Sequence, residues 1–287
     1  MAFDADHLGL PRNALTLLRD LIHERTGLFY DDGRCDMMAD RLSGLVTERG
    51  FESFLDYYYL LKYDNPAAEW HRVMDALSVP ETYFWREADQ LHAIADAIVP
   101  ALAREAPNRP ISIWCVPCAT GEEPLSIAML LDQGGWFDRA DIELHASDAS
   151  PAMVERARAG AYRERSFRAL PPALRERYFE RRGDLSHVAP RLHARVRSWS
   201  VVNLKNRAEV EPRAAADVIV CRNVFIYFSP AAVRQVVDTF ADRMPLPGYL
   251  CIGATESLLR VTDRFELTEI AGAFVYEKRP ASAEGKA

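Results

Sequence analysis

Apolar residues change their spacing about a third of the way along the chain. Before residue 78 they recur every three to four positions, which is the period of an amphipathic helix. Gly27, Gly50 and the pair Asn65-Pro66 interrupt this pattern, and glycine and proline commonly end helices. Four helices are therefore predicted, over residues 13–27, 34–50, 51–66 and 68–78. Together they indicate a small all-helical domain.

From residue 111 the pattern becomes one of short apolar strands that alternate with helices. The candidate strands are ISIWCV, IELHASD, SWSVVN, DVIVC, YLCIG, FELTEI and FVYEK. The helices between them include EEPLSIAMLLD, SPAMVERARAG and SPAAVRQVVDTFADRM. This alternation predicts an α/β domain with a mostly parallel sheet covered on both faces. The last two strands are only a short loop apart, which predicts an antiparallel hairpin at the end.

Segments that fit neither pattern mark the boundaries. The chain divides into a helical domain, a linker with a connecting helix, an α/β domain and a polar tail predicted to be disordered: residues 1–78, 79–98, 99–279 and 280–287. The segment 162–197 fits the alternation poorly because it contains Pro171-Pro172 and many arginines. We interpret it as an insertion into the sheet domain, with a small β-subdomain at about 180–202.

Composition is ordinary for a globular protein. Hydrophobic residues make up 49% and charged residues 27% of the 287 residues. The first ten residues lack the features of a signal peptide, and no run approaches the roughly 18 to 20 apolar residues of a membrane helix. The odd number of cysteines, five, argues against a disulfide scaffold. We therefore expect a cytoplasmic protein with no direct membrane insertion.

Charge is spread unevenly along the chain. The net charge is -7, yet residues 155–197 contain twelve arginines and five acids, a local balance of +7. The block could face an acidic partner, or its arginines could simply solvate helix surfaces. Both interpretations remain open at this point.

Polar residues follow the predicted strands at their carboxyl ends, where open α/β sheets bind ligands. They are Glu122, Glu123, Asp148, Asn203, Arg222, Asn223 and Glu256. The chain has neither a G-x-G-x-x-G motif nor a Walker lysine, so phosphate binding is not indicated. A carboxylate after the second strand suits a ribose diol, and Glu123 could meet a positive group. A nucleoside that carries a cation and no phosphate, such as S-adenosylmethionine, fits this pattern.

These residues also have structural interpretations. Asp148 could cap the helix predicted to begin at Pro151, and Tyr227 could be a buried strand-end aromatic. Cys115 and Cys118 form a C-x-x-C pair, but no second pair or nearby histidine completes a zinc site, so no metal is expected.

Several blocks of the chain resemble the signature blocks of the CheR family, the chemotaxis receptor glutamate methyltransferases. They are SVPETYFWRE, CATGEEPLSIA, ASDASPAMVERARAGAY, VVNL, CRNVFIYF and IGATESL, and they occur in the family's order. The resemblance covers residues from about 15 to 278. It implies a helical N-terminal domain followed by a Rossmann-like methyltransferase sheet with an inserted small β-subdomain.

The resemblance also implies roles for individual residues. The cofactor-binding set is Thr82, Arg86, Glu123, Asp148, Asn203, Leu204, Asn223 and Val224, with Asp148 on the ribose. Tyr227 is expected near the transferred methyl group, and Arg86 and Arg222 are expected to orient the substrate carboxylate. A bidentate arginine suits that task because its fork matches a carboxylate.

The chain departs from the family pattern at a few positions. Pro80 stands where a polar residue that touches the cofactor is common, and Ala254 stands where a histidine is common. The second predicted helix is often strongly basic in the family, whereas here its arginines and acids balance. The insertion also looks short, which predicts that the protein works without a tethering pentapeptide at the receptor's C-terminus.

The sequence therefore predicts an S-adenosylmethionine-dependent enzyme that methylates glutamates on the cytoplasmic helical bundle of methyl-accepting chemoreceptors. Its products are glutamate methyl esters and S-adenosylhomocysteine, and it is expected to act as a monomer. One alternative is a catalytically weak regulatory module that only binds the cofactor. Another is a nucleic-acid methyltransferase, but the N/D-P-P-Y/F motif is absent and the basic block has few aromatics for base stacking. We expect no nucleic-acid partner.

Overall fold

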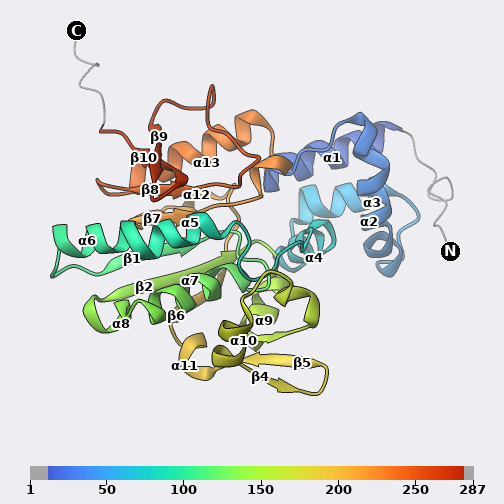
Figure 1. Ribbon diagram of the computed structural model, residues 1–287. Coiled ribbons are helices and arrows are strands. Elements are labelled where there is room, and N and C mark those ends of the chain that lie inside the picture. Colours follow the sequence, from blue (N-terminus) through green and yellow to red (C-terminus); the bar gives the residue numbers. More distant parts are fainter. Residues whose placement is uncertain (1–11, 281–287) are drawn as a thin grey trace, which may run out of the picture.

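The computed structural model describes residues 12–280 and shows two domains joined by a linker (Figure 1). The residues before 12 lie outside the described part, and so does most of the tail predicted at 280–287. No helix of the described residues is long and apolar enough to cross a membrane.

The N-terminal domain is a bundle of short helices, as the pattern predicts. Its helices are α1 (Arg12–Thr26), a 3₁₀ turn η2 (Asp32–Arg34), α2 (Cys35–Glu48), α3 (Phe54–Tyr59), a π-helical turn η3 (Leu60–Asp64) and α4 (Ala67–Leu77). Their apolar faces meet in a single core that includes Leu18, Leu42, Phe54 and Val73. Glu69 is fully buried among them and accepts a hydrogen bond from the Tyr57 hydroxyl at 2.9 Å.

A long helical rod follows the linker. It consists of α5 (Ala88–Ala93), a π-helical turn η4 (Ile94–Ile98) and α6 (Val99–Glu105). Pro100 cannot donate a backbone hydrogen bond, and the wide turn just before it accommodates the proline ring. The rod thus continues past residue 98, where the sequence pattern placed the end of the connecting helix.

The α/β domain is built on a seven-stranded sheet in the order β6-β2-β1-β7-β8-β10-β9. The strands are β1 (Ile111–Cys115), β2 (Ile142–Asp148), β6 (Val196–Val201), β7 (Val218–Val220), β8 (Tyr249–Cys251), β9 (Phe265–Ile270) and β10 (Ala273–Lys278). The first five run parallel, and β10 pairs antiparallel with both β8 and β9. The predicted parallel sheet and terminal hairpin are therefore confirmed.

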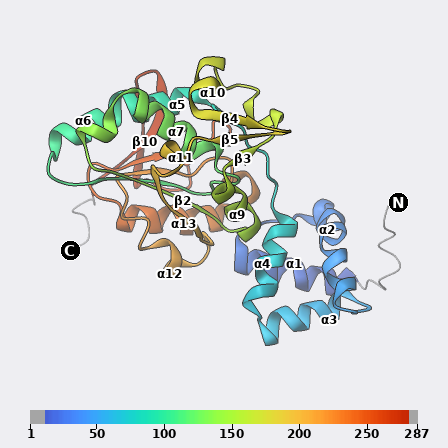
Figure 2. The same cartoon turned by 90° about the horizontal axis from the view of Figure 1, so that it is seen from below.

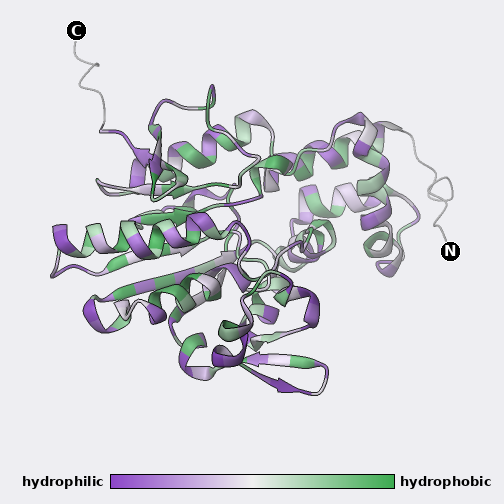
Figure 3. Ribbon diagram, viewed as in Figure 1, coloured by the Kyte–Doolittle hydropathy of each residue, from purple (hydrophilic) through white to green (hydrophobic). Residues whose placement is uncertain are grey.

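Helices cover both faces of this sheet, which gives the domain two cores. Alternate residues of β1 separate them: Ile113 packs with α5, α6 and α7, whereas Trp114 packs with α13. The helices are α7 (Glu122–Gln133), α8 (Trp136–Arg139), α9 (Pro151–Ala159), α12 (Arg207–Val210), a 3₁₀ turn η6 (Phe225–Tyr227) and α13 (Pro230–Arg243). Figure 3 shows apolar residues gathered along the central strands between the helices.

A small unit is inserted between α9 and β6. It contains β3 (Ala161–Tyr162), a 3₁₀ turn η5 (Glu164–Phe167), α10 (Pro172–Tyr178), β4 (Phe179–Arg182), β5 (Leu185–Val188) and α11 (Pro190–His193). Its strands form a separate antiparallel sheet in the order β3-β5-β4.

The predicted limits of the β-subdomain, about 180–202, need correction. The small sheet begins at Ala161, and β6, which falls within the predicted limits, pairs with β2 in the large sheet. A strand of two residues such as β3 is too short to show any periodicity, so the sequence pattern could not place it.

Figure 2 shows the N-terminal helices at one end of the α/β domain, with α4 facing α9. The two domains also make backbone contacts between the segment that follows α1 and the segment that follows β7. The Phe29 amide donates to the Tyr227 carbonyl at 2.7 Å, and Leu28 forms an isolated β-bridge with Phe228. The N-terminal domain therefore stands over the carboxyl ends of the parallel strands.

Candidate active site

A cavity lies where the N-terminal domain, the linker and the carboxyl ends of the strands meet. All ten site residues that the sequence indicates line this single cavity: Thr82, Arg86, Glu123, Asp148, Asn203, Leu204, Arg222, Asn223, Val224 and Tyr227. The N-terminal domain adds apolar and basic side chains, among them Phe29, Met37 and Arg41. The fold therefore brings together residues that lie up to 145 positions apart in the sequence.

Asp148 ends β2, and its side chain is almost fully buried. One carboxylate oxygen accepts the backbone N–H of Ala119 and the other that of Ser150, each at 2.9 Å. Burial raises the pKa of Asp148 to about 6, although these backbone donors oppose the shift. The helix cap role belongs to Ser150, whose hydroxyl accepts from the Met153 amide, so Asp148 does not itself cap α9.

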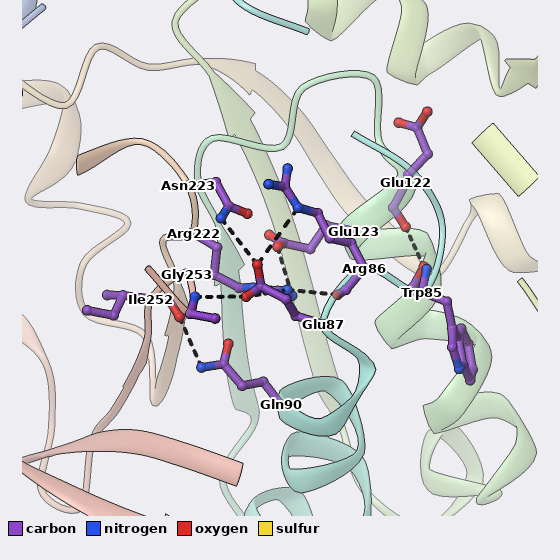
Figure 4. A network of polar contacts seen from close by, with 12 residues as sticks. Trp85, Arg86, Glu87, Gln90, Glu122, Glu123, Arg222, Asn223, Ile252 and Gly253 are labelled. Carbon is purple, nitrogen blue, oxygen red and sulfur yellow. Dashed lines mark hydrogen bonds and ion pairs between the residues drawn. The ribbon is translucent and has the colours of Figure 1, made fainter. Parts of the chain in front are cut away.

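Glu123, in the first turn of α7, belongs to a buried ionic network (Figure 4). Arg222 lies between two acids, 3.3 Å from Glu123 and 3.1 Å from Glu87, and it donates to the Arg86 carbonyl at 2.7 Å. Burial raises the pKa of Glu123 to about 7 despite the nearby Arg222 cation. The Arg222 cation instead holds the pKa of Glu87 below its usual value. Of the two carboxylates beside Arg222, Glu87 therefore favours the ionised form more strongly than Glu123 does.

The linker places Arg86 at the mouth of this network. The Arg86 guanidinium donates to the Glu81 carbonyl at 2.7 Å, and its side chain keeps 27% exposure. Arg222 keeps only 1%. Of the two arginines in this network, Arg86 is therefore the accessible one, at 3.8 Å from Glu87, whereas Arg222 is committed to two carboxylates.

Three residues around the cavity adopt the left-handed backbone conformation without being glycine. Glu87, Ala119 and Asn223 have φ angles of 50°, 44° and 60°. Such conformations cost energy and cluster at ligand sites, where surrounding contacts hold them. Here Glu256 is one such contact, because its carboxylate accepts the amides of Asn223 at 2.9 Å and Gly253 at 2.7 Å.

The remaining indicated residues complete the walls. The Asn203 side chain donates to the Arg25 carbonyl at 2.8 Å, so it also links the sheet to the end of α1. Tyr227 and Val224 come from the turn that follows β7, and Tyr227 faces the cavity next to the α1–α2 loop. Leu204 is buried beside them.

Sequence reasoning missed two residues that organise the site. Glu87 forms an ion pair with Arg222 at 3.1 Å, and it accepts from the Asn223 side-chain amide at 3.3 Å and from the Ala254 backbone N–H at 3.1 Å. Asp75 on α4 accepts from the Ser150 hydroxyl and from the Ala152 N–H at 3.2 Å, and thereby joins the N-terminal domain to the loop after Asp148. Glu87 directly follows Arg86 in the quoted linker block, which was the one signal available.

Comparison with known proteins agrees with this geometry. Residues 13–78 match the CheR methyltransferase all-alpha domain, and residues 80–274 match the CheR methyltransferase SAM-binding domain. The chain belongs to the CheR methyltransferase family. It is an S-adenosylmethionine-dependent methyltransferase, and the resemblance deduced from the sequence is confirmed.

Curated relatives extend over nearly the whole chain. Chemotaxis protein methyltransferase 2 of Vibrio cholerae serotype O1 is 33% identical over 91% of this chain and 91% of its own length. Chemotaxis protein methyltransferase of Klebsiella aerogenes is 32% identical over 87% of this chain and 85% of its own length. The probable biofilm formation methyltransferase WspC of Pseudomonas putida is 32% identical over 89% of this chain and 59% of its own length.

The buried polar atoms of this CheR methyltransferase fit the cofactor. One Glu123 oxygen is buried without a hydrogen-bond partner in the described residues, and it can accept from the cationic methionine end. Asp148 is a buried carboxylate that has no ion pair within the described part of the chain, which suits a pair of ribose hydroxyl donors. Ala254 stands where the family commonly has a histidine, yet its backbone is still fixed at the site, because its N–H donates to Glu87 at 3.1 Å.

Proposed function

We propose that this methyltransferase acts on glutamate side chains of the cytoplasmic helical bundle of methyl-accepting chemoreceptors. The products are glutamate methyl esters and S-adenosylhomocysteine, and the protein acts as a cytoplasmic monomer. The observation that carries this proposal is the arrangement of Arg86, a partly exposed cation at the mouth of a cavity whose inner carboxylates are the buried Asp148 and the largely buried Glu123. A carboxylate substrate is attracted to the mouth and repelled from the inner positions.

The inner residues hold the cofactor in this proposal. Asp148 accepts the ribose hydroxyls, Glu123 faces the positive methionine end, and Thr82, Asn203, Leu204, Asn223 and Val224 form the walls. When bound, the cofactor supplies a sulfonium methyl group that is already activated for transfer to a carboxylate oxygen. The acceptor needs no general base, because a glutamate is ionised at neutral pH.

What remains for the protein is alignment and exclusion of water. Arg86 orients the substrate carboxylate through its fork of donors, and Tyr227 confines the reacting groups from the β7 side. Such positioning is worth roughly 7–11 kcal/mol in the most favourable systems. Arg222 contributes by fixing Glu123 and the Arg86 backbone, since its own side chain is buried between acids.

The proposal includes independence from a receptor tether. The small sheet consists of strands of two to four residues, with β4 and β5 joined by a two-residue turn. Strands this short offer little backbone for pairing with an added peptide. A receptor lacking its C-terminal pentapeptide should therefore be modified as fast as the complete receptor.

The test is transfer from methyl-labelled cofactor to receptor-containing membranes, followed by treatment with base. Glutamate methyl esters release labelled methanol in base, whereas methylated amines do not. Base-labile label on the receptor, absent with Asp148→Ala, is expected. Cofactor binding without any transfer would instead favour the catalytically weak regulatory module.

A further inference from the structure

Three arginines of the inserted region stand apart from the others. Of the twelve arginines in residues 155–197, nine have an ion pair, a hydrogen bond or an aromatic ring for a partner. Arg156, Arg163 and Arg165 have no such partner among the residues that the structure describes. All three are exposed, and all three line one cleft. We call this set the arginine cleft.

The arginine cleft adjoins the cofactor cavity. Pro80 and Thr82 of the linker line both, so the two share a wall. The arginines come from the opposite side: Arg156 from α9, Arg163 from the residue between β3 and η5, and Arg165 from η5. A chain segment that inserts a side chain beside Thr82 would therefore have its neighbouring residues within the cleft.

The acids near the cleft are already engaged. Glu81 pairs with Arg168 at 2.5 Å, and Glu164 pairs with Arg175 at 2.6 Å. Glu122 lines the cleft but is buried, with its carboxylate accepting from Thr120 at 2.6 Å and Ser166 at 2.9 Å. The three cations of the arginine cleft are thus left for an acidic partner.

The N-terminal domain offers less free positive charge. Arg34 lies 3.9 Å from Asp31, Arg49 pairs with the buried Glu69, and Arg41 donates to the Leu77 carbonyl at 2.9 Å. Within the described residues, the inserted region is thus the face beside the linker that presents unpartnered cations.

We propose that the arginine cleft binds the acidic residues that flank the modified glutamate on a receptor helix. The inference rests on the proposed function and adds to it the surface that selects the substrate segment. Carboxylates one helical turn apart lie on the same face of a helix, about 5.4 Å from each other along its axis. The glutamate to be modified can enter the cavity beside Arg86, while a carboxylate one turn away contacts the arginine cleft on the other side of Thr82.

The chemistry of the cleft favours an acidic helix over a nucleic acid. Tyr162 is the aromatic side chain that lines it, and this ring is buried at 3% exposure. Base stacking, which supplies much of the affinity for single strands, has no platform there.

The experiment compares two triple variants of the full-length protein. One is Arg156→Ala with Arg163→Ala and Arg165→Ala. The matched control is Arg158→Ala with Arg182→Ala and Arg197→Ala, which removes the same charge from arginines that already have acidic partners. Initial rates of receptor methylation are measured against receptor concentration at several salt concentrations, and calorimetry with S-adenosylhomocysteine checks that each cofactor site is intact.

The cleft variant is expected to raise the KM for receptor about tenfold, as three exposed ion pairs would. Its kcat and its affinity for S-adenosylhomocysteine should stay within about twofold, and its rate should depend less on salt. The control should keep the wild-type KM within about twofold.

Equal KM values for the two variants would overturn the inference and leave the proposed function standing. Cleft-dependent binding of an oligonucleotide, with an unchanged receptor KM, would also overturn it. A wild-type protein that binds S-adenosylhomocysteine but transfers no methyl group to receptors would refute the proposed function, and the inference with it.

Discussion

Cofactor affinity should fall in acid because Asp148, the carboxylate that we propose binds the ribose, is buried and has no cation paired with it among residues 12–280. In the described structure the two oxygens of Asp148 accept from the backbone N–H groups of Ala119 and Ser150, and burial raises the pKa of Asp148 to about 6. Only the ionised carboxylate can accept both ribose hydroxyl hydrogens. A ligand that selects the ionised form therefore binds in proportion to the fraction ionised.

The size of the effect follows from the titration. With a pKa of about 6, nearly all of Asp148 is ionised at pH 7.5 and only about a tenth at pH 5, so the Kd should rise about tenfold. Glu123, with a pKa of about 7, adds a second step of the same sign. Titration of S-adenosylhomocysteine into Glu123→Gln removes that step and isolates the one from Asp148.

The same shift makes a stability prediction of opposite sign. The folded-state pKa of Asp148 lies above the usual aspartate value of 3.8, so the folded protein binds this proton more tightly than the unfolded chain does. The resulting stabilisation is present below about pH 3.8 and is lost as the pH rises through about 6, a difference of about 3 kcal/mol. Asp148→Asn should therefore be at least as stable as wild type at pH 7.5 without cofactor, although it binds cofactor poorly.

Calorimetry at pH 5, 6 and 7.5 and urea unfolding at pH 7.5 check these two expectations. The reasoning fails if Glu123→Gln binds S-adenosylhomocysteine equally well at pH 5 and pH 7.5. It also fails if Asp148→Asn lowers the free energy of unfolding by more than about 2 kcal/mol, because the carboxylate would then be a net stabilising group.

Other perturbations test the rest of the site. Arg222→Met leaves the partly buried Glu87 and Glu123 without their cation, and urea unfolding should show a loss of about 2–4 kcal/mol; a loss below about 1 kcal/mol would contradict the network. Asp75→Ala removes the acceptor for Ser150 and should cost about 1 kcal/mol and weaken S-adenosylhomocysteine binding severalfold by calorimetry; unchanged affinity would show that Asp75 only joins the two domains. Tyr227→Ala should lower kcat about tenfold or more with little change in cofactor Kd, since it loosens alignment; an unchanged kcat would exclude that role. A receptor C-terminal pentapeptide should show no micromolar binding in a titration, and such binding would contradict tether independence.

The strand-end residues could be predicted because their geometry follows from topology. Parallel strands end at the same edge of the sheet, so Glu123, Asp148 and Asn223 had to converge once the strands were found. The linker residues Thr82 and Arg86 were predicted from the resemblance of the block SVPETYFWRE to the family, because no hydrophobic periodicity distinguishes them.

The rest depended on tertiary contacts that leave no local pattern. Glu87 accepts hydrogen bonds from the loops that follow β7 and β8. Asp75, on α4, accepts a hydrogen bond from the start of α9. The limits of the inserted sheet were misplaced because the short β3 gives no signal and because they overlapped β6, which the sequence had also indicated as a strand of the large sheet. The sequence shows that the insertion is rich in arginine. The structure is needed to distinguish the arginines that have a partner from Arg156, Arg163 and Arg165.

The central claim is that this site esterifies receptor glutamates, and peptide mapping by mass spectrometry tests it most directly. Receptor membranes are incubated with the protein and with cofactor carrying a deuterated methyl group, and the receptor is then digested and sequenced by fragmentation. The account predicts the labelled methyl group on glutamate side chains of the cytoplasmic helices, lost after mild base and absent with Asp148→Ala. Label confined to lysine, arginine or cysteine side chains, or no label with a protein that binds S-adenosylhomocysteine, would contradict it.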